Sequence, residues 1–292
     1  MNAQRLEATA VATAIAPIEP SLQHIGRAAV AALYDELALE PKPGLVSFVD
    51  SGSHRDMDAR TFMRSLFALR HTFFNLARLG AAGADFAALE REGVAAEARM
   101  LKATGSINTH RGAIFSIGLL CAAASAAVAR GAPLRPPAIR RTLLDRWGDT
   151  LAARCLRPSS SHGASAARLF GLRSVGAEAA LGFPVLFEST FPALRSAIRL
   201  GMDPQRARVQ ALFHTIATLE DTNLAHRGGL AGLRYAQRTA RDFLVAGGAS
   251  RKDGLDAARS VHRDFVARNL SPGGSADVLA AACWLQRVCA GP

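Results

Sequence analysis

The chain has 292 residues, 49% of them hydrophobic, and a formal net charge of +11. This apolar content can form a sizeable core, and no Ser/Gly-rich or Pro-rich linker divides the sequence, so we expect a flexible N-terminal tail (residues 1–20) followed by one helical domain (residues 21–292). The sequence has no run of Lys or Arg, no basic stretch interleaved with aromatic residues and no zinc-finger spacing, which argues against a nucleic-acid partner. The charge itself is equally compatible with binding of small polyanions.

In the N-terminal half, helical periodicity is clearest at residues 62–79, where apolar side chains recur every three or four positions. They predict one buried helix face, and Gly80 is expected to end the helix. The apolar stretch at residues 114–129 is short for a bilayer and predicts a buried core helix. Because the N-terminus also lacks a secretory pattern, we expect a cytoplasmic protein with no membrane contact. The Pro-containing residues 130–137 predict a turn between two helices.

In the C-terminal half, Asp203 and Pro204 have the pattern of a helix N-cap followed by proline at the first helical position. Ser250 is expected to cap a further helix, and Ser275 or Asp277 to open the last one. Strand-like patterning is confined to residues 45–49. We therefore predict an all-α fold, a single multi-helix bundle domain of about ten to twelve helices. The polar segments then fall at helix ends, where the active site is expected, because backbone N–H groups and the helix dipole are available there.

The first polar segment spans residues 40–46 and continues to residues 52–58. Lys42 lies between two prolines, which predict a stiff loop. Its side chain is interpreted either as a phosphate contact or as an ordinary solvated lysine. His54 and Arg55 stand beside Asp56 and Asp58, a pair of carboxylates that could share a magnesium ion. Alternatively, Asp58 caps a helix that begins after it.

The second polar segment is residues 108–112. Asn108 or Thr109 is expected to cap the apolar helix that follows, and Arg111 to meet an anion at its start, next to His110. Upstream, Glu97 is a candidate base if its helix face borders the site, and otherwise an exposed helix residue. Glu178 has the same two interpretations.

The third and fourth polar segments lie in the last third of the chain. Asp221 and Asn223 precede Arg227, Gly228 and Gly229, which pairs an acid or metal ligand with an arginine beside flexible backbone. Residues 269–275 form a Pro-Gly-Gly loop whose polar groups could wrap a phosphate or pantetheine, or could simply connect two helices. The candidates in this loop are Ser271, Gly273 and Ser275.

These four segments, in this order, resemble the triphosphoribosyl-dephospho-CoA synthase family, and most of all its malonate decarboxylase type. The resemblance covers the chain from about Pro41 to the C-terminus. It implies transfer of the triphosphoribosyl group of ATP to the ribose 2′-hydroxyl of dephospho-CoA with release of adenine. The product would be the prosthetic-group precursor for an acyl carrier protein and would pass to a phosphoribosyl-dephospho-CoA transferase. Alternatives are the same reaction serving citrate lyase, a magnesium-dependent hydrolase of ribosyl or phosphate bonds, or a non-catalytic helical nucleotide-binding module.

The resemblance also implies roles for the candidate residues. Magnesium is expected as cofactor, ATP is a substrate, and a homo-oligomer is compatible with the family. Asp56, Asp58 and Asp221 would hold magnesium or offset positive charge at C1′, and Glu97 or His110 would be the acid–base groups. Phosphates are assigned to the cations Lys42, Arg55, Arg111 and Arg227. The remaining expected substrate contacts are His54, Asn108, Thr109, Glu178, Asn223, Gly228, Gly229, Ser271, Gly273 and Ser275.

Overall fold

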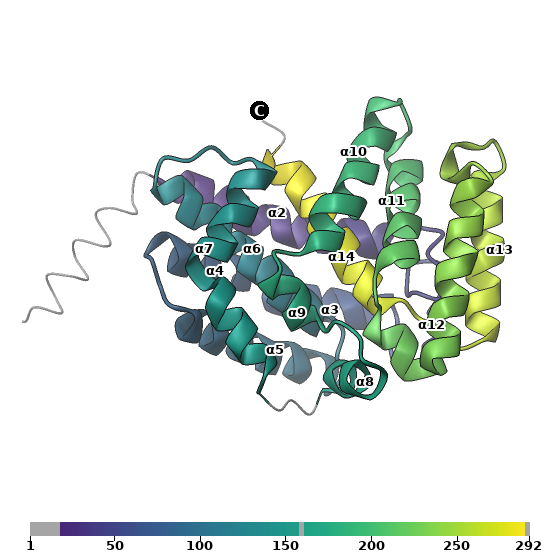
Figure 1. The fold of residues 1–292 in the computed structure, drawn as a ribbon, viewed down its shortest axis with the longest axis horizontal. Helices are drawn as coiled ribbons and strands as arrows, with labels where there is room; N and C mark the ends of the chain where they lie inside the picture. The colour runs from purple at the N-terminus through teal and green to yellow at the C-terminus, as the bar shows by residue number, and fades with distance from the viewer. Residues whose placement is uncertain (1–17, 158–160, 290–292) are drawn as a thin grey trace, which may run out of the picture.

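The computed structural model describes residues 18–157 and 161–289, and within these ranges it contains helices and no strand (Figure 1). The prediction of an all-α fold is therefore confirmed. The expected tail at residues 1–20 lies outside the described residues except for its last three, of which Glu19 begins the first helix. The α-helices are α2 (Glu19–Ala38), α3 (Ala59–Leu69), α4 (Thr72–Ala81), α5 (Phe86–Thr104), α6 (Arg111–Ala129), α7 (Pro136–Cys155), α8 (His162–Phe170), α9 (Val175–Ala180), α10 (Phe191–Arg199), α11 (Pro204–Thr218), α12 (Thr222–Val245), α13 (Gly254–Ala267) and α14 (Gly273–Cys289). A π-helix (Val185–Thr190) leads into α10, and a 3₁₀ turn (Gly248–Ser250) precedes α13.

Helix α6 forms the centre of the core, as its uninterrupted apolar sequence predicts. Nearly every residue from Ala113 to Ala127 is buried, and α6 packs against α4, α2, α7 and α14. In the described part of the chain it is the one helix long and apolar enough to cross a bilayer, but here the protein itself covers it. Figure 1 shows α14 running through the middle of the molecule beside α2, which brings the two ends of the described chain into one core.

The periodic segment at residues 62–79 is divided between two helices, α3 and α4, so the prediction of one continuous helix is wrong. The chain turns at Arg70 and His71, whose side chains gave no signal of a break. Helix α4 ends at Ala81, one residue after Gly80, so the predicted end agrees to within one residue. The glycine also has a packing role, because its missing side chain lets α4 approach the backbone of Ala122 on α6. A Cβ atom on Gly80 would overlap the Ala122 carbonyl group, so close helix packing explains this glycine.

Two further local predictions, a strand and a helix start, are wrong, and one helix N-cap is confirmed. Residues 45–49 are a loop rather than a strand, buried at residues 45–47 and exposed at Phe48 and Val49. Helix α13 begins at Gly254, since Ser250 belongs to the 3₁₀ turn before it. Asp203 caps α11 as predicted, accepting a hydrogen bond from the backbone N–H of Arg206, with Pro204 at the first helical position.

Candidate active site

A cavity of about 1220 Å³ opens where the N-termini of α6, α12 and α14 converge, and all four polar segments contribute to its lining. The three non-glycine residues with positive φ in the described chain, Ser106, Phe183 and Asn269, also line it. Such backbone conformations cost energy and persist where surrounding structure imposes them, which happens disproportionately at functional sites. The π-helix that follows Phe183 is a second irregularity of this kind.

The loop after α2 places Lys42 beneath this cavity rather than in it. The side chain of Lys42 is fully buried, and its Nζ donates to the Glu36 carboxylate (2.6 Å) and to the Glu36 carbonyl oxygen (2.7 Å). Burial lowers the pKa of Lys42, while the Glu36 carboxylate acts in the opposite direction. This differs from the expected phosphate contact: the lysine holds Glu36, and it is Glu36 that lines the cavity.

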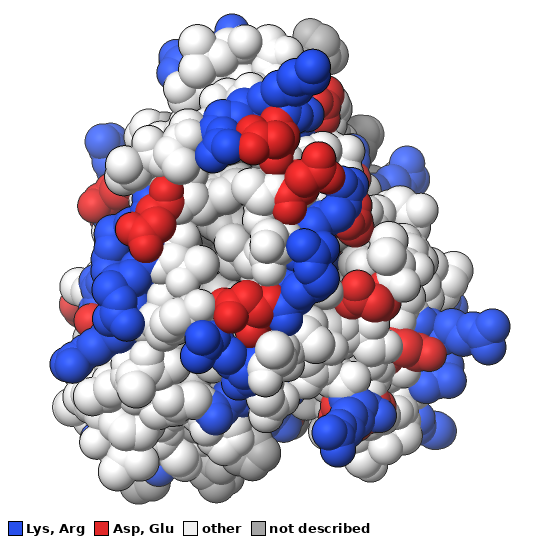
Figure 2. All heavy atoms as spheres, turned by 90° about the vertical axis from the view of Figure 1, so that its right-hand side faces the viewer, with Lys and Arg blue, Asp and Glu red and all other residues white. Residues whose placement is uncertain are grey.

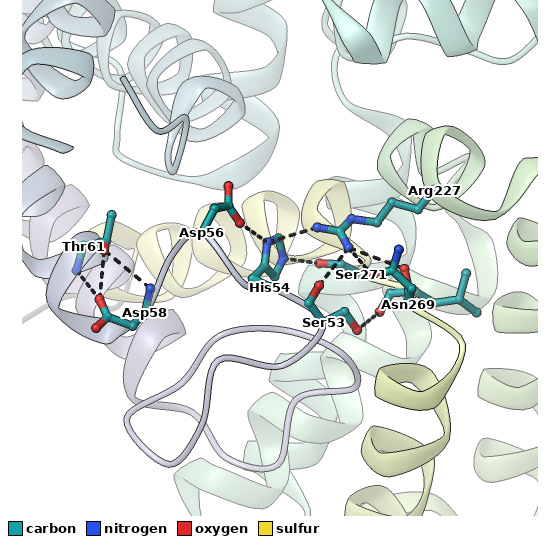
Figure 3. Close-up of polar contacts among 9 residues, drawn as sticks. Ser53, His54, Asp56, Asp58, Thr61, Arg227, Asn269 and Ser271 are labelled. Carbon is teal, nitrogen blue, oxygen red and sulfur yellow. Dashed lines mark hydrogen bonds and ion pairs between the residues drawn. The ribbon is translucent and has the colours of Figure 1, made fainter. Parts of the chain in front are cut away.

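Arg227 joins three separate segments around His54 (Figure 3). One terminal nitrogen donates to the Ser53 carbonyl oxygen and to Asn269 Oδ1 (both 2.9 Å), and the other donates to His54 Nδ1 (3.0 Å). Because Nδ1 accepts this bond, His54 carries its proton on Nε2 and donates it to Ser271 Oγ (2.9 Å). Burial, and then the positive charge of Arg227, lower the pKa of His54 to about 4, so the imidazole is neutral at physiological pH.

The two aspartates of the first segment take different directions (Figure 3). Asp56 is largely exposed on the cavity rim, with Oδ1 3.7 Å from His54 Nδ1. Asp58 is the N-cap of α3: its Oδ1 accepts from the backbone N–H and the hydroxyl of Thr61, both at 2.8 Å, in a capping box. The alternative that Asp58 caps a helix is thus observed. Neither Asp58 nor Arg55 belongs to the cavity lining.

Asp221 caps two helices at once. Its Oδ1 accepts from the backbone N–H groups of Asn223 (3.0 Å), Leu224 and Gly274, and its Oδ2 accepts from the N–H (2.8 Å) and Oγ (2.9 Å) of Ser275. The first two donors open α12 and the others open α14. Burial raises the pKa of this carboxyl, whereas the hydrogen bonds lower it. Four of the five donors are backbone N–H groups, which favour the charged form of this carboxyl group.

The second segment forms the entrance to α6. Asn108 Oδ1 accepts from the backbone N–H of Arg111 (3.2 Å), but the N-cap of α6 is His110 and its side chain makes no capping bond, so the prediction of Asn108 or Thr109 as N-cap is wrong. Arg111 forms an ion pair with Glu97, which lies part-buried on the α5 face that borders the cavity. Thr109 lines the cavity with a buried hydroxyl group that has no hydrogen-bond partner among the described residues.

His110 is a lining residue of the cavity and has one ring nitrogen without a partner among the described residues. Its side chain is buried, Nδ1 lies 2.6 Å from Ser65 Oγ, and Nε2 has no partner in the described part of the chain. Burial, with a smaller contribution from the Lys42 charge, lowers the pKa of His110 to about 3. A neutral imidazole offers one directional hydrogen bond to a ligand but carries no spare proton near pH 7.

The far wall of the cavity contains Glu178, on α9. Glu178 is buried, pairs with Arg173 (3.3 Å) and accepts a weak hydrogen bond from the Val185 N–H, and burial raises the pKa of its carboxyl group. Arg173 also contacts Glu220, which precedes Asp221. Of the two interpretations of Glu178, the structure shows a buried residue on the cavity lining rather than an exposed one.

The glycines of the third and fourth segments allow close backbone approach. Gly229 has φ 62° and ψ −169°, a region that only glycine adopts readily, and it breaks α12. A Cβ on Gly228 would overlap the side chain of Leu270, and one on Gly273 would overlap Asn223. Gly273, Asn223 and Ser271 line the cavity, whereas Gly228, Gly229 and Ser275 do not.

Comparison with known families adds to this geometry. A family model for the CitG family, ATP:dephospho-CoA triphosphoribosyl transferase, matches residues 22–291. The chain belongs to this family. It is therefore a triphosphoribosyl-dephospho-CoA synthase, a transferase that acts on ATP and dephospho-CoA. No solved structure matches the chain.

The charge of this transferase's cavity is opposite to that of the whole protein. The chain has a net charge of +11, but the cavity is lined by twice as many carboxylates as guanidinium groups. Three of its arginines are paired with carboxylates. The carboxylates belong to Glu36, Asp56, Glu90, Glu97, Glu178, Glu220, Asp221 and Asp277, and the guanidinium groups to Arg111, Arg154, Arg173 and Arg227.

Magnesium fits only part of the expected ligand set. Over residues 18–157 and 161–289, no group of three or more His, Cys, Asp or Glu side chains is arranged to hold a metal ion. Asp58 and Asp221 cap helices, so the three expected ligands do not form one site. Asp56 alone remains exposed and faces the cavity. One carboxylate suffices where an ion keeps its other ligands from phosphates and water, as magnesium commonly does.

Sequence reasoning missed Glu36 and Asp277 as site residues. Glu36 continues the buried stripe formed by Leu22, Ile25 and Leu33 on α2, so it is a charge at a core position. That position was the available signal, because carboxylates are rarely buried without a partner or a function. Asp277 stands in the apolar sequence of α14, where the sequence suggested only a helix cap.

Proposed function

We propose that the cavity binds ATP and dephospho-CoA side by side and catalyses attack of the dephospho-CoA ribose 2′-hydroxyl on C1′ of ATP, with release of adenine. The observation that carries this proposal is a single cavity of about 1220 Å³ that all four polar segments line. Pockets for one ligand usually measure about 300–1,000 Å³, so this volume suits two substrates. Holding both in one site removes much of the entropic barrier to their reaction.

The excess of carboxylates suits the charge that develops at C1′. Departure of a nucleobase builds positive charge on the ribose, and preorganised carboxylates in a cavity stabilise that charge. Asp221 is already fixed by five hydrogen bonds, so it can act without reorganising. Glu97 is the proposed base for the 2′-hydroxyl proton, since it is part-buried and borders the cavity. Neutral His110 contributes a hydrogen bond through Nε2.

The triphosphate needs cations that the cavity does not supply in excess. Arg111 and Arg227 are the proposed phosphate contacts on the lining, and Arg55 lies exposed nearby in the loop. Lys42 acts indirectly by fixing Glu36. We propose that magnesium enters bound to the triphosphate and that Asp56 contributes one ligand, with the remaining positions taken by phosphate oxygens and water.

We further propose that the product serves the acyl carrier protein of malonate decarboxylase and passes to a phosphoribosyl-dephospho-CoA transferase in the cytoplasm. The basis for proposing this type is the resemblance of the four segments. On the face that Figure 2 shows, basic and acidic side chains are interspersed. Whether the apo carrier protein of malonate decarboxylase or of citrate lyase is modified, when each is supplied with the downstream transferase, separates the two types.

The central test incubates the purified protein with ATP, dephospho-CoA and magnesium and identifies the products by mass spectrometry. We expect free adenine and a coupled product that keeps all three phosphates. Adenine release without dephospho-CoA would indicate a ribosyl hydrolase, and release of phosphate or pyrophosphate a phosphohydrolase. Asp56→Asn should raise the magnesium concentration needed for half-maximal turnover, whereas Asp58→Asn should not, because asparagine caps a helix about as well as aspartate.

A further inference from the structure

Asp277 stands where α14 crosses the first turn of α6, on the cavity wall. Its carboxyl group accepts a hydrogen bond from the Ala113 N–H, and its Oδ2 lies directly over the Cα of Gly112. A Cβ on Gly112 would overlap that oxygen, so the glycine between Arg111 and Ala113 makes room for the carboxyl group. The α6 N-terminus, where the sequence suggested a phosphate, is thus already in contact with an internal acid.

The charges around Asp277 leave it without a counter-ion. Glu36 on α2 and Asp221 at the start of α12 are both close enough to repel a negative charge on it. Lys42, the buried cation of this region, is committed to Glu36. Asp221 has five donors, whereas the interactions that favour a charged Asp277 reduce to the bond from Ala113.

The remaining titratable groups facing this region do not change that balance. His110, at the entrance to α6, is neutral near pH 7. Arg111 directs its guanidinium group to Glu97. Desolvation of this part-buried carboxyl group, followed by Glu36 and Asp221, raises the pKa of Asp277 well above its usual range. The carboxyl group therefore holds a proton at a pH at which other aspartates have lost theirs.

We propose that Asp277 is the general acid that protonates the departing adenine, an assignment that rests on the function proposed above. The C1′–N9 bond of ATP breaks with its electron pair leaving on the purine, which takes the Asp277 proton on a ring nitrogen. The 2′-oxygen of dephospho-CoA forms the new bond to C1′ and loses its proton to Glu97. Solvent then returns a proton to Asp277 and removes one from Glu97. Adenine and the coupled product leave, and every atom is accounted for.

The positions of Glu97 and Asp277 fit their proposed roles as base and acid. Glu97 forms an ion pair with Arg111, and Asp277 contacts Gly112 and Ala113. The two carboxyl groups therefore lie beside the first turn of α6, and both residues line the same cavity. Glu97 is paired with a guanidinium group, whereas Asp277 has two carboxylates as neighbours. Environments that oppose each other in this way separate an acid from a base at one pH.

The test compares two leaving groups in wild-type protein and in Asp277→Asn. The substrates are ATP and 6-chloropurine riboside 5′-triphosphate, whose base departs with less need for a proton. With ATP, kcat should fall by about 10²–10⁴-fold, the usual range for loss of a general acid, and KM should change little. The alkaline decline of kcat should disappear. With the chloropurine substrate the loss should be much smaller, whereas an equal loss with both substrates would overturn the assignment.

Two further variants serve as controls. Asp256→Asn removes an exposed carboxylate from α13 and should retain wild-type kcat with both substrates. Asp277→Glu keeps a carboxyl group and should keep the wild-type leaving-group dependence even if turnover is lower. Melting temperatures of all variants show whether a loss of turnover reflects unfolding.

A direct titration separates this assignment from the proposed function. In protein labelled with ¹³C at aspartate carboxyl carbons, the resonance present in wild type and missing from Asp277→Asn reports the charge of Asp277. We expect a protonated carboxyl group at pH 7. An ionised group would overturn the role of Asp277 alone. Failure of the wild type to release adenine in the presence of dephospho-CoA would instead overturn the proposed function, whatever the titration shows.

Discussion

Replacement of Asp221 by asparagine should strongly destabilise the protein. Oδ2 of Asp221 accepts the backbone N–H and the hydroxyl of Ser275 at the start of α14, and Oδ1 accepts donors from both helices. Asparagine places an NH₂ group at one of these oxygen positions, so a donor faces donors. Because Asp221 is buried, water cannot replace the lost acceptor.

The magnitude follows from the two bonds at Oδ2. Hydrogen bonds to a charged group contribute roughly 1.5–3 kcal/mol each, which gives a loss of about 3–6 kcal/mol in the free energy of unfolding. The Ser275 hydroxyl can rotate to accept from the new amide, which favours the lower end of this range. A domain of ordinary stability has roughly 5–15 kcal/mol in total, so the variant should lose a large part of it.

Urea denaturation followed by far-UV circular dichroism measures this loss, with the slope m compared between proteins to confirm the same cooperative transition. Asp58→Asn is the matched control, because Asp58 is also an N-cap aspartate but is exposed and serves one helix. It should leave the midpoint unchanged. A change of less than about 1 kcal/mol in Asp221→Asn would refute the reasoning, because it is smaller than a single charged hydrogen bond.

Three further changes test individual features of the site. Because burial lowers the pKa of His110 from 6.5 to about 3, the unfolded state takes up a proton as the pH falls below 6.5, whereas the folded state takes one up only near pH 3. The free energy of unfolding should therefore decrease as the pH is lowered through this window. His110→Asn should reduce that slope by about one proton, and an unchanged slope in urea denaturation at several pH values would contradict it. Gly229→Ala should destabilise the fold by about 1–3 kcal/mol because of the positive φ, whereas Gly148→Ala, inside α7 with space for a Cβ, should stabilise it slightly, as thermal unfolding of the two variants would show. Arg227→Met should raise the pKa of His54 above about 4, since a cation at Nδ1 is removed, and a titration of the ring proton by NMR that shows no rise would count against the neutral pairing.

The sequence alone determined the fold class and the segments of the site. Helical spacing nearly everywhere, with few β-branched alternations, is a local property, so an all-α prediction required no knowledge of the packing. The N-cap at Asp203 and the capping alternative for Asp58 were equally local, because both depend on donors within three residues. The order of the four polar segments was enough to indicate the family.

The tertiary structure decided what individual residues contact, because these contacts join positions far apart in the chain. Gly80 has the pattern of a helix end and also serves the crossing of α4 and α6. Asp221 caps α14 from 54 residues upstream, a relation that no local rule contains. Lys42 turns inward because Glu36 lies within reach across the loop. Asp277 faces the cavity with two carboxylates around it only because α2, α12 and α14 meet there, and burial makes that meeting chemically consequential.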